Sequence, residues 1–145
     1  MGSLTISNVT KTFGSTEVLK GINIDIADGE FLILVGPSGC GKSTLMNTIA
    51  GLDEVTSGQL LLEGEDVTDR SPKDRDIAMV FQSYALYPTM NVARNISFGL
   101  EMRGISRAER DQRVQEVSSL LQIDHLLDRK PSQLSGGQRQ RVAMG

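Results

Sequence analysis

The sequence predicts an α/β fold in which a parallel sheet is accompanied by an antiparallel β layer and an all-helical insertion. Residues 31–35 and 77–81 are continuous apolar runs with the length and branched side chains of buried parallel strands. Residues 4–9 and 18–26 alternate between apolar and polar side chains, which is typical of half-exposed strands and predicts the antiparallel layer. After residue 90, two helical patterns follow one another without a strand between them.

The elements around the first apolar run follow in order. A turn at residues 27–29 leads into the run 31–35, and residues 45–50 read as a helix that ends near Gly51. Residues 59–64 then read as a surface hairpin.

The second half of the chain is expected to be mainly helical. Residues 83–90 contain both tyrosines and are too irregular for a strand, so they are expected to form a contact surface. Residues 91–103 read as one helix, and the capping box from Ser106 to Glu109 begins another. The apolar positions are Val92, Ile96 and Leu100 in the first helix and Val114, Val117 and Leu121 in the second.

Composition excludes several classes of protein. The chain has 145 residues, 39% of them hydrophobic and 23% charged, as in an ordinary globular domain. A net charge of −3 argues against a protein that mainly binds nucleic acid, and Arg139 and Arg141 are expected to be a solvated helix face. No apolar run approaches the roughly 20 residues that a bilayer requires. Cys40 is the single cysteine, which rules out an internal disulfide and fits a reducing cytoplasm.

A glycine-rich motif stands between the first apolar run and the helix that follows it, and it matches the P-loop pattern of Gly, four free positions and Gly-Lys-Ser/Thr. Its members are Gly36, Pro37, Ser38, Gly39, Cys40, Gly41, Lys42, Ser43 and Thr44. Glycines let the loop turn its N–H groups inward, and the helix start adds further donors, so the motif predicts a polyphosphate site. Lys42 would reach the β- and γ-phosphates, and Ser43 would place its hydroxyl on Mg²⁺. Cys40 beside Lys42 is expected to be more reactive than a buried thiol, although an inert filler is an equal alternative.

Three further positions are candidates for the same chemistry. Phe13 stands alone among polar residues before a glycine, where its ring would either stack on an adenine base or make a satellite core contact. Gln82 ends the second apolar run, which follows a polar turn at residues 72–76, and would complete the Mg²⁺ shell or hold a water. Ser135 is a good N-cap, and the glycines after it let a helix start approach an anion.

Together these residues resemble the nucleotide-binding subunit of ATP-binding cassette (ABC) transporters, a P-loop NTPase family, over the whole chain. Residues 36–44 match its Walker A loop, Phe13 its adenine-stacking aromatic and Gln82 its Q-loop. Leu134 and the residues after it match the signature sequence letter for letter, namely Leu134, Ser135, Gly136, Gly137 and Gln138. The sequence from residue 75 to residue 88 is most similar to the same segment in carbohydrate-uptake importers of the maltose and glycerol 3-phosphate type.

The resemblance implies an ATPase that couples ATP binding and hydrolysis to solute uptake. ATP and Mg²⁺ would bind between two subunits arranged head to tail, with Lys42, Gln82 and Ser135 as the catalytic side chains. Ser135, Gly136, Gly137 and Gln138 of one subunit would contact the nucleotide held by the other. The expected partners are a second such subunit, transmembrane permease subunits and, indirectly, an external solute-binding protein. The expected location is the cytoplasmic face of the cell membrane, as a peripheral subunit.

The resemblance also predicts an incomplete domain. The family continues into the Walker B strand, a D-loop and a switch histidine, so we expect residues 1–145 to bind ATP without turnover, to expose apolar surface and to fold marginally. Within them, residues 1–82 and 130–145 are expected to form the core and β layer, and residues 83–129 the helical subdomain. The alternatives are an importer for another small solute, an ABC-type ATPase of DNA repair or chromosome architecture, and a P-loop kinase or GTPase.

Overall fold

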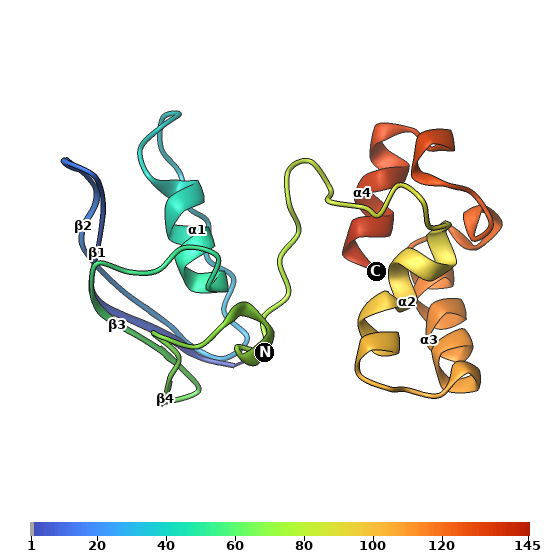
Figure 1. Cartoon of the computed structure of the whole chain (residues 1–145), viewed down its shortest axis with the longest axis horizontal. Coiled ribbons are helices and arrows are strands. Elements are labelled where there is room, and N and C mark those ends of the chain that lie inside the picture. The colour runs from blue at the N-terminus through green and yellow to red at the C-terminus, as the bar shows by residue number, and fades with distance from the viewer. Residues whose placement is uncertain (1) are drawn as a thin grey trace. The chain divides into compact units, whose positions relative to one another are not determined.

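The computed structural model describes residues 2–145, and the chain divides after Met79 into two compact units (Figure 1). The elements of the first unit are β1 (Leu4–Phe13), β2 (Thr16–Ile26), α1 (Lys42–Ala50), β3 (Ser57–Leu62), β4 (Glu65–Asp66) and the 3₁₀ helix η1 (Pro72–Asp74). Those of the second unit are α2 (Val92–Met102), α3 (Arg107–Leu120), the 3₁₀ helices η2 (Asp124–Leu126) and η3 (Pro131–Gln133), and α4 (Gly136–Met144).

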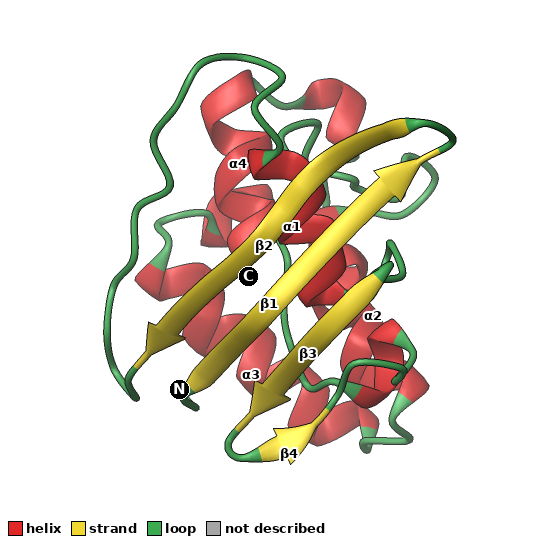
Figure 2. Cartoon of the chain, turned by 90° about the vertical axis from the view of Figure 1, so that its left-hand side faces the viewer, coloured by secondary structure: helices red, strands yellow, loops and turns green. Residues whose placement is uncertain are grey.

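The first unit contains the predicted antiparallel layer, a sheet with strand order β2-β1-β3-β4 (Figure 2). Leu4 and Ile6 point to the buried face of the sheet, but strict alternation would next place Asn8 there. Asn8 instead has a left-handed φ of 48°, and the register shifts beside it, so that the bulge turns Val9 inward. The amide that the bulge removes from the ladder donates to Asn23 Oδ1 at 2.8 Å.

The expected surface hairpin is also present, between β3 and β4. Leu62 pairs with Glu65, which leaves Glu63 and Gly64 as a two-residue loop. Their φ angles of 51° and 80° are the positive values that a type I′ turn requires.

The P-loop helix α1 packs on one face of this sheet. Leu45 of α1 is 6% exposed and joins Ile6, Val9 and Leu60 in the core of the unit. Burial of a leucine side chain of this kind contributes about 1.5–3 kcal/mol. The helix ends where the sequence predicts, because Gly51 at its C-cap has a left-handed φ of 78°.

The two predicted parallel strands are absent from the described residues. Residues 31–35 and 77–81 have no strand assignment, and Phe31, Ile33 and Val35 are 85%, 68% and 89% exposed. Strand formation depends on neighbouring strands more than on residue type, and no described segment pairs with either run. The expectation of exposed apolar surface is therefore confirmed, whereas the expectation of buried strands is wrong.

The second unit has the predicted helices around its own core. Asn91 caps α2 by accepting from the Arg94 amide, and Ser106 caps α3 by accepting from the Glu109 amide. Glu109 also pairs with Arg113 at 3.1 Å, one turn further along the helix. The core consists of Val92, Ile123, Leu126, Leu134 and Val142.

Helix α4 belongs to the second unit in this chain. Its Val142 is 3% exposed and packs in the same core as Val92 of α2. The expected grouping of residues 130–145 with the β layer stays a prediction about the domain organisation.

Candidate phosphate-binding site

Residues 36–44 form a loop that opens directly into α1. Gly39 and Gly41 have left-handed φ angles of 81° and 95°, which favour glycine, and Lys42 is the first residue of the helix. A Cβ at Gly41 would lie 3.2 Å from the Val18 carbonyl oxygen, whereas a Cβ at Gly39 would meet no described atom within 4 Å. Gly39 therefore faces open space, and Gly41 fits closely against the sheet.

Lys42 folds back over this loop. Its Nζ donates to the carbonyl oxygens of Gly36 at 2.6 Å and Pro37 at 2.7 Å, and it lies 3.4 Å from Cys40 Sγ. The ammonium group is thus held against the loop, and the start of α1 adds N–H groups that have no partner within the helix. This arrangement of positive groups suits a phosphate.

Phe13 is the last residue of β1 and is 48% exposed, so it is no core contact. The Lys11 ammonium lies 4.9 Å from the centre of its ring and also donates to the Glu54 carbonyl oxygen. Lys11 is a site residue that the motifs do not reveal, although residues two apart on a strand share a face and this spacing pairs Lys11 with Phe13.

Gln82 does not end a strand, contrary to the prediction. It is exposed and lies in a turn that is closed by a hydrogen bond of 2.8 Å from the Tyr84 amide to the Phe81 carbonyl oxygen. Gln82 cannot end a strand because residues 77–81, which precede it, have no neighbouring strand to pair with and form no strand themselves.

The irregular segment after Gln82 is held in place by Asn95 of α2. Asn95 Oδ1 accepts from the Tyr87 amide at 2.8 Å, and its Nδ2 donates to the carbonyl oxygens of Tyr87, Met90 and Asn91 at 3.0–3.2 Å. The Tyr87 ring also lies 4.7 Å from the Phe98 ring, centre to centre. One amide side chain thus orders the segment that we expect to form a contact surface.

The second predicted anion-facing helix start is the N-terminus of α4. Ser135 Oγ accepts from the Gln138 amide at 3.3 Å, and Gln138 Oε1 accepts from the Ser135 amide at 2.9 Å, which is a complete capping box. A Cβ at Gly136 or Gly137 would meet no described atom within 4 Å, so this end of the helix is open. Arg139 is half-buried and its guanidinium donates to the Leu134 carbonyl oxygen at 2.7 Å, whereas Arg141 is exposed, as expected.

The candidate residues are therefore distributed over both units. Phe13 and the loop 36–44 belong to the first unit, and Gln82 and residues 135–138 belong to the second. Each unit thus contains one of the two glycine-rich helix N-termini that the sequence predicts.

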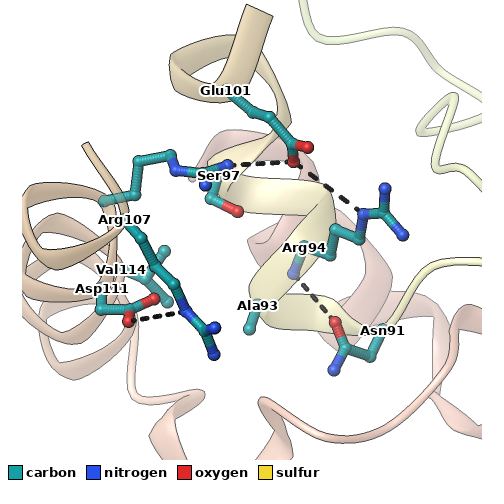
Figure 3. Close-up of a pocket in the computed structure, with 9 residues that line it drawn as sticks. Asn91, Ala93, Arg94, Ser97, Glu101, Arg107, Asp111 and Val114 are labelled. Atoms are coloured by element: carbon teal, nitrogen blue, oxygen red, sulfur yellow. Dashed lines mark hydrogen bonds and ion pairs between the residues drawn. The ribbon is translucent and has the colours of Figure 1, made fainter. Parts of the chain in front are cut away.

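A cavity of about 480 Å³ in the second unit lies apart from these residues (Figure 3). The α2 and α3 side chains around it are paired with one another, Glu101 with Arg94 at 3.9 Å and Arg110 at 3.0 Å, and Asp111 with Arg107 at 3.7 Å. Each of these guanidinium groups already faces a carboxylate. The cavity is lined by none of the predicted nucleotide-binding residues, so it adds nothing to the phosphate site.

The loop at the start of α1 and the glycine-rich, capped start of α4 are the two places where the sequence resembles ATP-binding cassettes. In agreement, the family model described as ABC transporter matches residues 19–145, and the chain belongs to this family. No helix among residues 2–145 combines the length and the apolar character that crossing a bilayer demands.

Relatives of known role match the whole chain. It is 56% identical over 145 residues to the maltose/maltodextrin import ATP-binding protein MalK of Yersinia pestis bv. Antiqua (strain Antiqua), covering 100% of this chain and 39% of the relative. It is 57% identical to the sn-glycerol-3-phosphate import ATP-binding protein UgpC 3 of Rhizobium etli, covering 100% of this chain and 42% of the relative. The chain thus spans about two fifths of the length of these curated relatives.

A solved structure has the same fold. It is the dimeric, post-hydrolysis state of the ATP-binding cassette MJ0796 bound to ADP and Pi, with 34% sequence identity and a TM-score of 0.85. The match covers 97% of this chain and 67% of that one. The predicted P-loop fold with an antiparallel layer and helices is thereby confirmed at the level of the fold class.

Proposed function

We propose that this chain binds ATP through residues 36–44 and is part of the ATP-binding subunit of an importer for a sugar or a sugar phosphate. The observation that supports it most directly is the loop geometry, in which the Lys42 ammonium is bonded to the Gly36 and Pro37 carbonyl oxygens and the loop leads directly into α1. The whole-chain similarity to MalK and UgpC supports the importer class and the type of solute.

Within the proposed site, Lys42 contacts the β- and γ-phosphates and Phe13 stacks on the adenine. Ser43 and Gln82 supply a hydroxyl and an amide oxygen to Mg²⁺. Both side chains are exposed, and hard oxygen donors of this kind fit an ion that keeps several waters and binds phosphates. The described residues contain no cluster of three or more His, Cys, Asp or Glu side chains that would compete as a metal site.

The second helix start is proposed to act on the nucleotide of a partner copy. Ser135 and the N–H groups of Gly136 and Gly137 contact the γ-phosphate across a head-to-tail homodimer. The open face of the two glycines and the dimeric state of the related cassette MJ0796 support this arrangement. Closing and reopening of the pair on ATP binding and hydrolysis by the intact subunit then drives the permease.

The segment from residue 84 to residue 90 is proposed as the surface that contacts the permease subunits. Tyr87 is 46% exposed, and Asn95 holds this segment in a defined shape, as a docking surface requires. We accordingly propose that the subunit lies at the cytoplasmic face of the cell membrane, with an external solute-binding protein as an indirect partner.

Titration of the chain with Mg-ATP tests the nucleotide site. Lys42→Ala should weaken binding at least tenfold, because a charge-assisted contact contributes about 1.5–3 kcal/mol. Lys20→Ala, on an exposed position of β2, is the matched control and should bind like the unaltered chain. Equal affinity of the Lys42→Ala chain would overturn the proposed site.

The transport role needs a separate test with the intact subunit in its native membrane. Mild extraction followed by identification of co-purifying chains should recover membrane-spanning permease subunits. Recovery of DNA or of repair proteins in their place would favour the non-transport alternative.

A further inference from the structure

Arg75 is buried, although its neighbours in the sequence predict only a polar turn. It is 3% exposed, and its guanidinium makes four hydrogen bonds to backbone carbonyl oxygens. Nε donates to the Arg70 carbonyl oxygen at 2.8 Å and Nη2 to that of Thr68 at 2.8 Å, while Nη1 donates to those of Thr48 at 2.7 Å and Ile49 at 3.0 Å.

Two of these acceptors belong to the P-loop helix. Thr48 and Ile49 lie in the last turn of α1, where carbonyl oxygens lack partners within the helix. A positive charge at this end of a helix is favoured by the helix dipole, and charged donors form the stronger hydrogen bonds. Burial lowers the pKa of Arg75 and the Asp69 carboxylate opposes this effect, but a guanidinium keeps its charge at neutral pH.

Gly51 is shaped to admit this side chain. A Cβ on Gly51 would lie 2.7 Å from Arg75 Nε and 3.0 Å from its Cζ, so any larger residue displaces the guanidinium. The Gly51 amide meanwhile donates to the Asn47 and Thr48 carbonyl oxygens. The carbonyl oxygens at the C-terminus of α1 are therefore bonded both by the amide of the capping Gly51 and by the side chain of Arg75, which lies 24 positions after Gly51 in the sequence.

We infer that Arg75 is a positioning residue for the phosphate-binding end of α1, an inference that rests on the proposed nucleotide site. The helix has nine residues, and a helix of that length moves as a rigid rod about 14 Å long. Fixing its last turn to the segment 68–75 therefore fixes the direction in which Lys42 and Ser43 are presented at its first turn. Arg75 touches neither of these residues and acts on phosphate binding through the helix alone.

The test compares Arg75→Met and Arg75→Lys with two core variants of the same unit, Ile6→Val and Leu60→Ala. The core variants weaken the sheet and its packing against α1 but leave the four Arg75 hydrogen bonds in place, so they control for a general loss of folding. Three quantities are measured for each chain: the midpoint of urea unfolding, the affinity for Mg-ATP, and the hydrogen exchange of amides 47–52 without nucleotide.

Arg75→Met should weaken Mg-ATP binding about tenfold, the scale seen when groups that orient a binding residue are removed. It should also speed the exchange of amides 47–52, and Arg75→Lys should restore part of both because an ammonium reaches fewer carbonyls. Core variants whose unfolding midpoint equals or lies below that of Arg75→Met should retain the Mg-ATP affinity and the slow amide exchange of the unaltered chain. Equal affinity of the Arg75→Met chain, or an equal loss in a core variant of matched stability, overturns the inference.

Gly51→Ala is the second variant if Arg75→Met does not fold. It keeps the arginine but displaces the guanidinium, and it should also weaken binding and speed exchange at residues 47–52. Gly64→Ala, at a φ of 80° with no described atom near its Cβ, carries the same backbone cost and should leave both quantities unchanged. If the unaltered chain binds no Mg-ATP, the proposed function fails, while the exchange data still decide whether Arg75 orders α1.

Discussion

At the scale of single residues, Lys42 is the side chain on which the proposed phosphate site depends most. Its ammonium is already bonded to the carbonyl oxygens of Gly36 and Pro37, so a phosphate would exchange two neutral acceptors for charged ones. The loop itself therefore holds the side chain near its working position. Little rotamer entropy remains to be lost on binding.

Cys40 reports on the same loop. It is exposed, it is the only cysteine in the chain, and its Sγ lies 3.4 Å from Lys42 Nζ. We predict that a maleimide labels it readily and that saturating Mg-ATP slows the labelling at least several-fold, because the nucleotide covers the loop. Labelling is followed by mass spectrometry, with Cys40→Ser as the blank. A labelling rate indifferent to Mg-ATP would contradict the prediction.

Asp66 predicts a pH dependence of stability. A hydrogen bond from the Thr68 hydroxyl, with further ones from Gln59 and the Thr68 amide, lowers the pKa of Asp66 to about 2 from 3.8. Because the folded pKa is the lower one, this stabilisation is complete above pH 3.8 and is lost as the pH falls toward 2. Asp66→Asn should therefore flatten the loss of stability in this window, as measured by urea unfolding at each pH.

Glu65→Gln is the control for this experiment. Glu65 is a neighbouring exposed carboxylate in the same short strand, and its contact is an ion pair with Arg70 at 2.8 Å. If the free energy of unfolding of the Asp66→Asn chain falls in parallel with that of the unaltered chain below pH 4, the account of Asp66 is wrong.

At the scale of elements, single side chains fix segments that have no regular structure of their own. The clearest case is Asn95, whose amide makes four hydrogen bonds within the stretch from Tyr87 to Asn91. A side chain of this kind replaces the backbone ladder that an irregular segment lacks. Hydrogen bonds from one side chain of α2 thereby hold this surface loop in place.

Asn95→Ala should release this loop while α2 stays folded. It should lower the free energy of unfolding by about 2 kcal/mol and speed the exchange of the Tyr87 amide, since it leaves several polar groups without partners. Asn91→Ala removes only the N-cap bond to Arg94, should cost about 1 kcal/mol, and should leave Tyr87 protected. Hydrogen exchange resolved to these amides makes the comparison; equal protection in both variants would refute the role of Asn95.

At the scale of the whole molecule, the sequence predicts what depends on local chemistry. The P-loop, the Gly51 stop, the Ser106 cap and the Ser135 cap each follow from a few adjacent residues, and all four elements are present. The apolar runs at residues 31–35 and 77–81 were predicted as strands, but strands need partners from elsewhere. Arg75 was missed for a related reason, since an arginine beside Lys73 and Asp74 reads as solvated until the fold brings the end of α1 to it.

The exposed run at residues 31–35 has a consequence for the behaviour of the chain in solution. Phe31, Ile33 and Val35 are largely exposed, and the run combines high β propensity with no charge and no proline. Such a segment with unpaired backbone groups is a template for pairing with another copy.

We predict that the chain self-associates with increasing concentration and that Ile33→Lys reduces this association, because a charge in the middle of the run opposes stacking of copies. Ser15→Lys adds the same charge in the β1–β2 turn and should leave association unchanged. Sedimentation velocity over a concentration series gives the measurement. If Ile33→Lys and Ser15→Lys associate alike, residues 31–35 are not the surface through which copies meet.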